Sequence, residues 1–150
     1  MILAVDVGNS NTTVGLFNGT GELLFRALLE TSRSKTRDQC AIELLGVFQL
    51  YGADACTVDG AILSSVVPPL TTIFTDAIAR LTGIPPMVVG PGIRTGLNIK
   101  AEIHNQLGSD IVASSVAAIA KYPSPIVMVD MGTATSLSLI VGSVYEGCII

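Results

Sequence analysis

Short apolar runs separated by turn residues open the chain. Residues 2–7, 12–17 and 22–29 are rich in aliphatic side chains, and the turn sequence NGTG at 18–21 separates the last two runs. Apolar runs on either side of an Asn-Gly pair are typical of a β-hairpin, because both residues tolerate positive φ angles. The pattern therefore predicts that the chain begins with three antiparallel strands.

The periodicity then changes to that of helices. Thr36 with Gln39 three positions later predicts a capping box, and apolar residues at helical spacing extend the first helix over about 37–51. A proline pair introduces a second apolar stripe, which predicts a helix over 69–82 that Gly83 ends. A short strand at 58–65 is expected between the two helices.

The rest of the chain predicts one more strand, one more helix and a second hairpin. The helix is Ala-rich, begins with Ser109 as its N-cap and ends before Pro123. The resulting order is β-β-β-α-β-α-β-α followed by β-β, which predicts a mixed α/β fold. The remaining segments are a strand at 85–89, a Gly-rich loop at 90–108, hairpin strands at 126–130 and 136–141, and a further strand starting near Val144 or Tyr145.

One local pattern occurs twice. Four apolar residues, then Asp-x-Gly and then short polar residues are found around Asp6 and again around Asp130, 124 positions later. Repetition at this distance indicates a duplicated domain. We therefore expect a first domain over 1–122 and the start of a similar one over 123–150. We also expect that the isolated chain exposes apolar surface, especially at 126–150, and is inactive by itself.

The duplicated turn has chemistry suited to phosphate. Its glycine lets a ligand approach the backbone, and its N–H, amide and hydroxyl groups are neutral donors to phosphate oxygens. The aspartate repels phosphate unless a cation lies between them, as in phosphoryl-transfer sites. The two turns together predict a clamp for a triphosphate.

Composition narrows the classes of protein to which the chain can belong. The chain has 49% apolar residues and a mean hydropathy of +0.64, but no apolar run approaches the roughly 18 residues of a membrane span. A net charge of −4, without a Lys/Arg cluster, argues against nucleic acid as a partner, and the short basic run at Arg33, Lys35 and Arg37 is expected to be solvated. Three cysteines, expected to be buried, and one histidine disfavour structural zinc and disulfides. A cytoplasmic location is expected.

Five ordered motifs resemble the type III pantothenate kinase family. They are DVGNSNTT (6–13), ILSSVVPPL (62–70), GPGIRTGLNIK (90–100), GSD (108–110) and VDMGTAT (129–135). The resemblance implies the ribonuclease H-like fold of actin-like ATPases. It also implies ATP-dependent phosphorylation of pantothenate to 4'-phosphopantothenate, the first step towards coenzyme A, by a cytoplasmic homodimer. A divalent metal such as Mg²⁺ and a monovalent cation, K⁺ or NH₄⁺, would be required.

The resemblance also implies roles for individual residues. Asp110 would be the catalytic base, Asp130 the ligand of the monovalent cation, and Asp6 a ligand of the divalent metal. ATP would contact the first turn and Thr133, and pantothenate would lie against the start of the third helix. The ATP-binding residues of the first turn are Asp6, Val7, Gly8, Asn9, Ser10, Asn11, Thr12 and Thr13, and the pantothenate-binding residues are Gly108, Ser109, Asp110 and Ile111.

The sequence departs from the family pattern at three places. Ile111 stands where the family usually has Arg, Ala101 where it commonly has Tyr, and Ser136-Leu-Ser138 where Thr-Phe-Asp is usual. These departures motivate two alternatives to pantothenate kinase activity. One is a kinase-like nucleotide-binding regulatory protein with impaired catalysis, and the other is a different small-molecule kinase or ATPase of the superfamily.

Overall fold

The computed structural model describes residues 1–90, 93–99 and 107–150. They form two compact units, Met1–Val89 and Gly90–Ile150, and each is described by itself. Ala101 lies outside the described residues. No helix among the described residues is long and apolar enough to cross a membrane.

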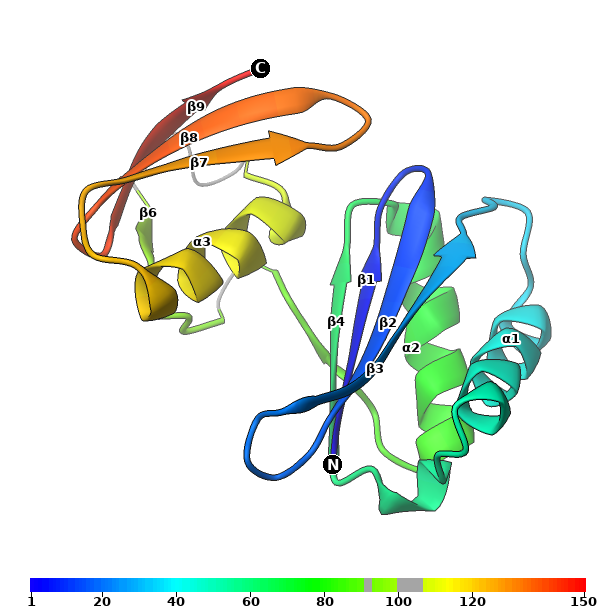
Figure 1. The fold of residues 1–150 in the computed structure, drawn as a ribbon. Coiled ribbons are helices and arrows are strands. Elements are labelled where there is room, and N and C mark those ends of the chain that lie inside the picture. The colour runs from blue at the N-terminus through cyan, green and yellow to red at the C-terminus, as the bar shows by residue number, and fades with distance from the viewer. Residues whose placement is uncertain (91–92, 100–106) are drawn as a thin grey trace. The chain divides into compact units, whose positions relative to one another are not determined.

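The first unit is built on a five-stranded mixed sheet (Figure 1). The first three strands pair antiparallel in chain order, and β4 and β5 extend the sheet in parallel from β1, so the strand order is β3-β2-β1-β4-β5. The predicted opening of three antiparallel strands is confirmed. The strands are β1 (Ile2–Val7), β2 (Asn11–Phe17), β3 (Leu23–Glu30), β4 (Gly60–Ser65) and β5 (Met87–Val88).

The turn between β2 and β3 differs in detail from the expectation. The hairpin forms, but Gly21 has the positive φ angle (82°), and neither Asn18 nor Gly19 does. The Asn18 side-chain oxygen accepts hydrogen bonds from the backbone N–H groups of Thr20 and Glu22 instead. Asn18 therefore stabilises the turn through its side chain, and glycine supplies the left-handed conformation at another position.

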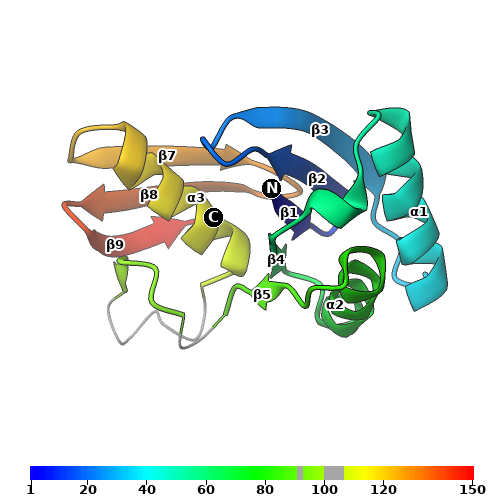
Figure 2. The ribbon, with the colours of Figure 1, turned by 90° about the horizontal axis from the view of Figure 1, so that it is seen from below.

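Two helices, α1 (Arg37–Leu50) and α2 (Pro68–Thr82), cover one face of this sheet (Figures 1 and 2). The capping box is confirmed, because Thr36 Oγ1 accepts from the Gln39 N–H while Gln39 Oε1 accepts from the Thr36 N–H. Alternate strand residues point into the core below the helices and the others point to the opposite face. Fully buried core residues include Leu3, Val7, Val14, Leu16, Leu44, Leu63, Leu70 and Ile78.

The second unit repeats the antiparallel meander. β7 (Ile126–Met131), β8 (Thr135–Val141) and β9 (Val144–Ile149) pair in chain order, and β6 (Asn98–Ile99) adds in parallel to β9. The second hairpin and the further strand near Val144 are thus confirmed. The duplication seen in the sequence is therefore also a repetition of three-stranded topology.

The third helix, α3 (Ser109–Lys121), groups with the second unit and not with the first. Ile111 and Ile119 pack against a small core of Ile126, Ile140 and Tyr145 on the second sheet. The chain therefore divides into its two compact units after Val89, whereas the expected boundary between the two domains lay after residue 122. The helix α3 belongs with the sheet whose apolar surface it packs against, and a sequence repeat alone does not reveal that surface.

Three other expectations are corrected. Gly108, not Ser109, is the N-cap of α3 and Ser109 is its first residue, because Gly108 has the extended conformation. β6 lies within the segment expected to be a loop. Only Cys40 is buried, whereas Cys56 and Cys148 are exposed free thiols.

Candidate active site

The first Asp-x-Gly turn lies at the carboxyl ends of two parallel strands. β1 and β4 run side by side, with Val7 paired with Ser65, and the chain turns back at Gly8 to enter β2. The Gly8 N–H donates to the carbonyl oxygen of Asn11 at 3.0 Å and closes the turn. Ligands of open α/β sheets bind outside the carboxyl ends of parallel strands, so this edge is a candidate binding edge.

Asp6 faces away from the helix-covered side of the sheet. Its neighbours in the ladder are Thr13 on β2 and Ser64 on β4. Asp6 is exposed, and Ser64 beside it is buried. Carboxylate and hydroxyl oxygens are suitable ligands for Mg²⁺, which usually keeps several waters and takes one or two protein carboxylates. Ser64 was not identified as a site residue from the sequence, because only the parallel pairing of β4 with β1 brings it to Asp6.

Two other residues of the first turn have a structural role. The Val7 side chain is fully buried, and the Thr12 hydroxyl is buried and lies 2.8 Å from the Thr31 hydroxyl. Both side chains lie on the helix-covered face and hold the turn in place. Asp6, Asn11 and Thr13 are therefore the strand residues of this motif whose side chains lie on the open face.

The connection between β3 and α1 braces the same turn. The Thr31 N–H donates to the Ser10 carbonyl at 3.0 Å, and the Arg33 guanidinium donates through Nη2 to Asn9 Oδ1 at 3.3 Å. Arg33 is exposed, as expected for a solvated run, and it also contacts the turn. The sequence separation of 24 positions between Arg33 and Asn9 concealed this contact.

The second Asp-x-Gly turn is closed in the same way. The Gly132 N–H donates to the carbonyl oxygen of Ala134 at 3.2 Å, and Thr133 lies exposed at the tip. Asp130 pairs with Ser136 six positions later, whereas the equivalent pair in the first turn, Asp6 and Thr13, is seven positions apart. The second turn is thus one residue shorter, while the glycine keeps the same hydrogen-bonding role.

Asp130 lies on the side of β7 that faces α3. It is half-buried, as is Met128, and Ser136 beside it on β8 is buried. Within the part of the chain that the structure describes, no hydrogen bond or ion pair reaches the Asp130 carboxylate. Its two oxygens are therefore available to a cation, the role that the family resemblance implies for this position.

Asp110 occupies the first turn of α3, and its Oδ1 accepts a hydrogen bond from the Ile111 N–H at 2.8 Å. The helix and β7 run in opposite directions, and 122–125 joins them. The start of α3 therefore lies at the same end of the unit as the carboxyl end of β7 (Figure 1). This arrangement brings three predicted site residues, Asp110, Asp130 and Thr133, to one end of the second unit.

Ile111 belongs to the small core of this unit. It is half-buried and packs with Ile126, Ile140 and Tyr145, so its side chain extends the apolar contact of α3 with the sheet. The hydroxyl of Tyr145 lies 2.9 Å from that of Ser138. Burial raises the pKa of Tyr145 to about 12, with the Ser138 contact lowering it and a hydrogen bond with Cys148 raising it. Ile111, Ile126, Ile140 and Tyr145 thus form the core between α3 and the second sheet.

No group of three or more His, Cys, Asp or Glu side chains with metal-binding geometry occurs in the described segments. A metal held mainly by nucleotide phosphates and waters does not need such a group, and a single carboxylate such as Asp6 fits that mode of binding.

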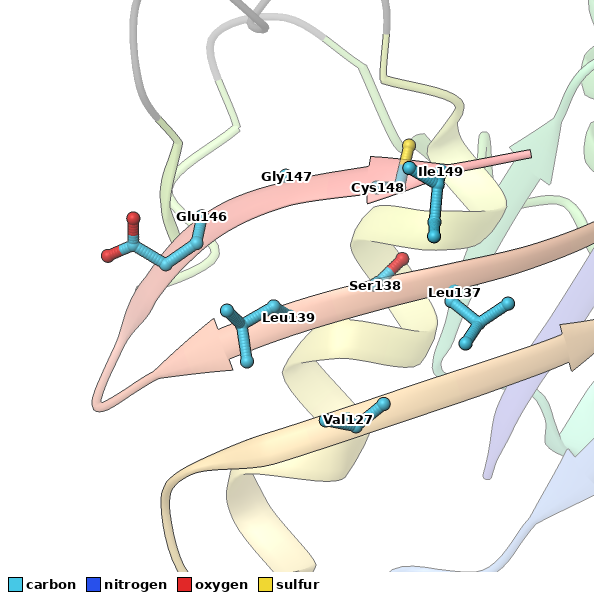
Figure 3. A pocket seen from close by; sticks show the side chains of 8 residues that line it. All are labelled: Val127, Leu137, Ser138, Leu139, Glu146, Gly147, Cys148 and Ile149. Atoms are coloured by element: carbon cyan, nitrogen blue, oxygen red, sulfur yellow. The ribbon is translucent and has the colours of Figure 1, made fainter.

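A mostly apolar groove lies on the sheet of the second unit, in contrast to the polar Asp-x-Gly turns. It has a volume of about 360 Å³ and is lined mostly by apolar side chains on strands β7, β8 and β9 (Figure 3). The expected exposure of apolar surface in this part of the chain is confirmed, because Val127 is 65% exposed and Met131 is 83% exposed. The groove contains none of the predicted site residues. Its lining is Val127, Leu137, Ser138, Leu139, Glu146, Gly147, Cys148 and Ile149.

Two similar meanders, each with an Asp-x-Gly turn, define an actin-like ATPase fold of the kind found in small-molecule kinases. The fold matches that of a Sinorhizobium meliloti protein assigned as a 2-dehydro-3-deoxygalactonokinase, with a TM-score of 0.58 and 13% identity over 99% of this chain and 52% of that one. At this identity the likeness shows the fold alone.

The family model of type III pantothenate kinase matches residues 2–150, and the chain belongs to this family. A type III pantothenate kinase of a Geobacillus species is 42% identical over 136 residues, which are 91% of this chain and 52% of the relative. The Listeria monocytogenes enzyme is 40% identical over 148 residues, which are 98% of this chain and 57% of the relative. The chain thus spans about half the length of the curated relatives it matches.

Proposed function

We propose that the protein transfers the terminal phosphoryl group of ATP to pantothenate and so makes 4'-phosphopantothenate, the first step of coenzyme A synthesis. The observation that carries the proposal is the pair of Asp-x-Gly turns, each closed by its glycine, in a chain of the type III pantothenate kinase family. We place this activity in the cytoplasm, in a homodimer.

In this proposal the first turn binds the nucleotide phosphates. Because the Gly8 N–H closes the turn, the polar groups of Asn9 and Ser10 are the neutral donors at the carboxyl end of β1. Thr133 is the corresponding nucleotide contact of the second turn. Asp6 would hold Mg²⁺, which neutralises charge on the phosphates when bound.

Asp110 orients the acceptor and takes its proton. A new bond forms between the pantothenate hydroxyl oxygen and the γ-phosphorus, the bond from that phosphorus to the β–γ bridging oxygen breaks, and ADP leaves. The hydroxyl proton passes to Asp110. Because Oδ1 of Asp110 already accepts from the Ile111 N–H, Oδ2 is the oxygen assigned to the substrate. A carboxylate suffices because the proton departs late when the transition state is loose.

Pantothenate would lie against the first turn of α3, along Gly108, Ser109 and Asp110. Asp130 would bind K⁺ or NH₄⁺ at the same end of the unit. In this chain Ile111 contributes packing and no charge to the substrate site, so backbone and hydroxyl groups would have to bind the pantothenate carboxylate.

The direct test is steady-state kinetics on the full-length native protein with Asp110→Asn. Loss of a general base should lower kcat by about 10²–10⁴. Asp76→Asn is the matched control, because Asp76 is an exposed carboxylate on α2 outside the proposed site. Equal turnover of Asp110→Asn and the wild type would remove Asp110 from the mechanism.

The packing of Ile111 favours a second candidate, a nucleotide-binding protein of this family with impaired catalysis. Calorimetry separates the two, because that protein would bind ATP without binding pantothenate. A third candidate, a kinase for another small molecule, would give ADP only with a different acceptor.

A further inference from the structure

A cationic side chain lies beside the first phosphate turn. The Arg33 guanidinium donates to the side-chain oxygen of Asn9, a neutral acceptor, and to no carboxylate in the described segments. A guanidinium has five N–H donors in a planar fork, and one contact leaves the others for a ligand. No carboxylate of the described residues therefore neutralises the positive charge of Arg33.

The neighbouring cations differ from Arg33 in this respect. Lys35 donates to the Glu30 carbonyl at 2.7 Å and forms an ion pair with Glu43 at 2.9 Å. Arg37 forms an ion pair with Asp38 at 3.6 Å. Of this basic run, Arg33 alone combines contact with the turn and a charge without a carboxylate partner in the described structure.

The backbone keeps Arg33 near the turn. Two residues before it, the Thr31 N–H donates to the Ser10 carbonyl and the Thr31 hydroxyl lies 2.8 Å from that of Thr12. Thr12 is buried, so this link is protected from water. The position of Arg33 beside Asn9 thus follows from anchored backbone as well as from its own hydrogen bond.

We propose that Arg33 binds the polyphosphate chain of the nucleotide at the first turn, with Asn9 orienting its guanidinium. The inference rests on the proposed function, because it assigns a further residue to the nucleotide site. The turn itself supplies only neutral donors and the Asp6 carboxylate repels phosphate, so a cation from a neighbouring segment adds the charge-assisted hydrogen bonds that the turn lacks.

The test compares Arg33→Gln with Arg37→Gln in the full-length native protein. Both variants remove one positive charge from the same segment, and matching thermal unfolding would show that both are folded. Calorimetry with MgATP and with inorganic tripolyphosphate then measures binding. We expect Arg33→Gln to weaken both ligands about tenfold to hundredfold, the loss typical of a charged hydrogen bond, and Arg37→Gln to bind within about twofold of the wild type.

Steady-state kinetics provide a second test of the role of Arg33. Arg33→Gln should raise KM for ATP and leave KM for pantothenate unchanged, and Arg33→Lys should recover part of the affinity because it keeps the charge without the fork. If Arg33→Gln binds both probes like the wild type while pantothenate is still phosphorylated, the role of Arg33 is refuted and the proposed function stands. If the wild-type protein binds neither MgATP nor tripolyphosphate, both proposals fail.

Discussion

The two duplicated turns respond differently to the same substitution, Gly→Ala. A Cβ added at Gly8 would lie 3.0 Å from the carbonyl oxygen of Asn11, whereas one added at Gly132 would lie 3.7 Å from the carbonyl oxygen of Ala134. Neither glycine has a positive φ angle, so the difference comes from close approach and not from backbone conformation. The oxygen of Asn11 also accepts the hydrogen bond that closes the turn, so moving it weakens that bond.

These distances set the expected magnitudes. Relieving a contact this tight costs about 1–3 kcal/mol, as in other overpacked sites, while Gly→Ala gains about 0.4–1 kcal/mol by restricting the unfolded chain. Gly8→Ala should therefore lower the free energy of unfolding by about 1.3 kcal/mol, within a range of about 0–2.6 kcal/mol. Gly132→Ala should leave that free energy unchanged or raise it by up to about 1 kcal/mol.

Urea unfolding of the native protein, followed by circular dichroism, measures both free energies. Hydrogen exchange assigns each effect to its unit, and the loss in Gly8→Ala should be localised to β1 and β2. Gly8→Ala should also weaken MgATP binding because it displaces the turn. Equal effects of the two substitutions, or a larger loss in Gly132→Ala, would refute the close-approach argument.

Three further predictions concern the second unit. The Ser115 hydroxyl is buried on α3 without a hydrogen-bond partner among the described residues. Ser115→Ala should therefore raise the free energy of unfolding by about 1 kcal/mol more than the exposed control Ser114→Ala. A loss of stability in urea unfolding would show that the hydroxyl is hydrogen-bonded. Folding raises the pKa of Tyr145 from 10.0 to about 12. The contribution of Tyr145 to the free energy of unfolding is therefore complete below pH 10 and is lost as the pH rises to about 12. Unfolding measured across this range should therefore be less pH-dependent in Tyr145→Phe, and an unchanged slope would contradict the assignment. Replacing K⁺ by Na⁺ should lower kcat in the wild type but not in Asp130→Asn, and indifference of the wild type to the cation would remove Asp130 from the cation site.

Local sequence signals predicted most of the first unit. The capping box at Thr36 and the prolines before α2 act within a few residues of the elements they start, so the helix bounds agree with the structure to within one residue. β4 begins two residues later than expected, because a 3-10 turn occupies Ala55–Thr57. The duplicated turn could also be found from the sequence, since a short motif defines each copy.

Long-range features were not predictable in this way. β6 is two residues long and forms by pairing Asn98 and Ile99 with β9, more than forty positions away. The packing of α3 on the second sheet depends on which apolar surface is nearest in three dimensions, and the helix sequence does not specify that surface. Ser64 and Arg33 reach the first turn through strand pairing and a loop contact, neither of which leaves a local sequence pattern.

The central claim is that this protein phosphorylates pantothenate. Incubation of the full-length native protein with MgATP, K⁺ and pantothenate, followed by phosphorus NMR and mass spectrometry, tests it most directly. We expect one ADP and one 4'-phosphopantothenate to form for each ATP consumed, with the phosphate on the primary hydroxyl. ATP binding without any phosphorylated pantothenate would contradict the claim and favour the nucleotide-binding protein with impaired catalysis.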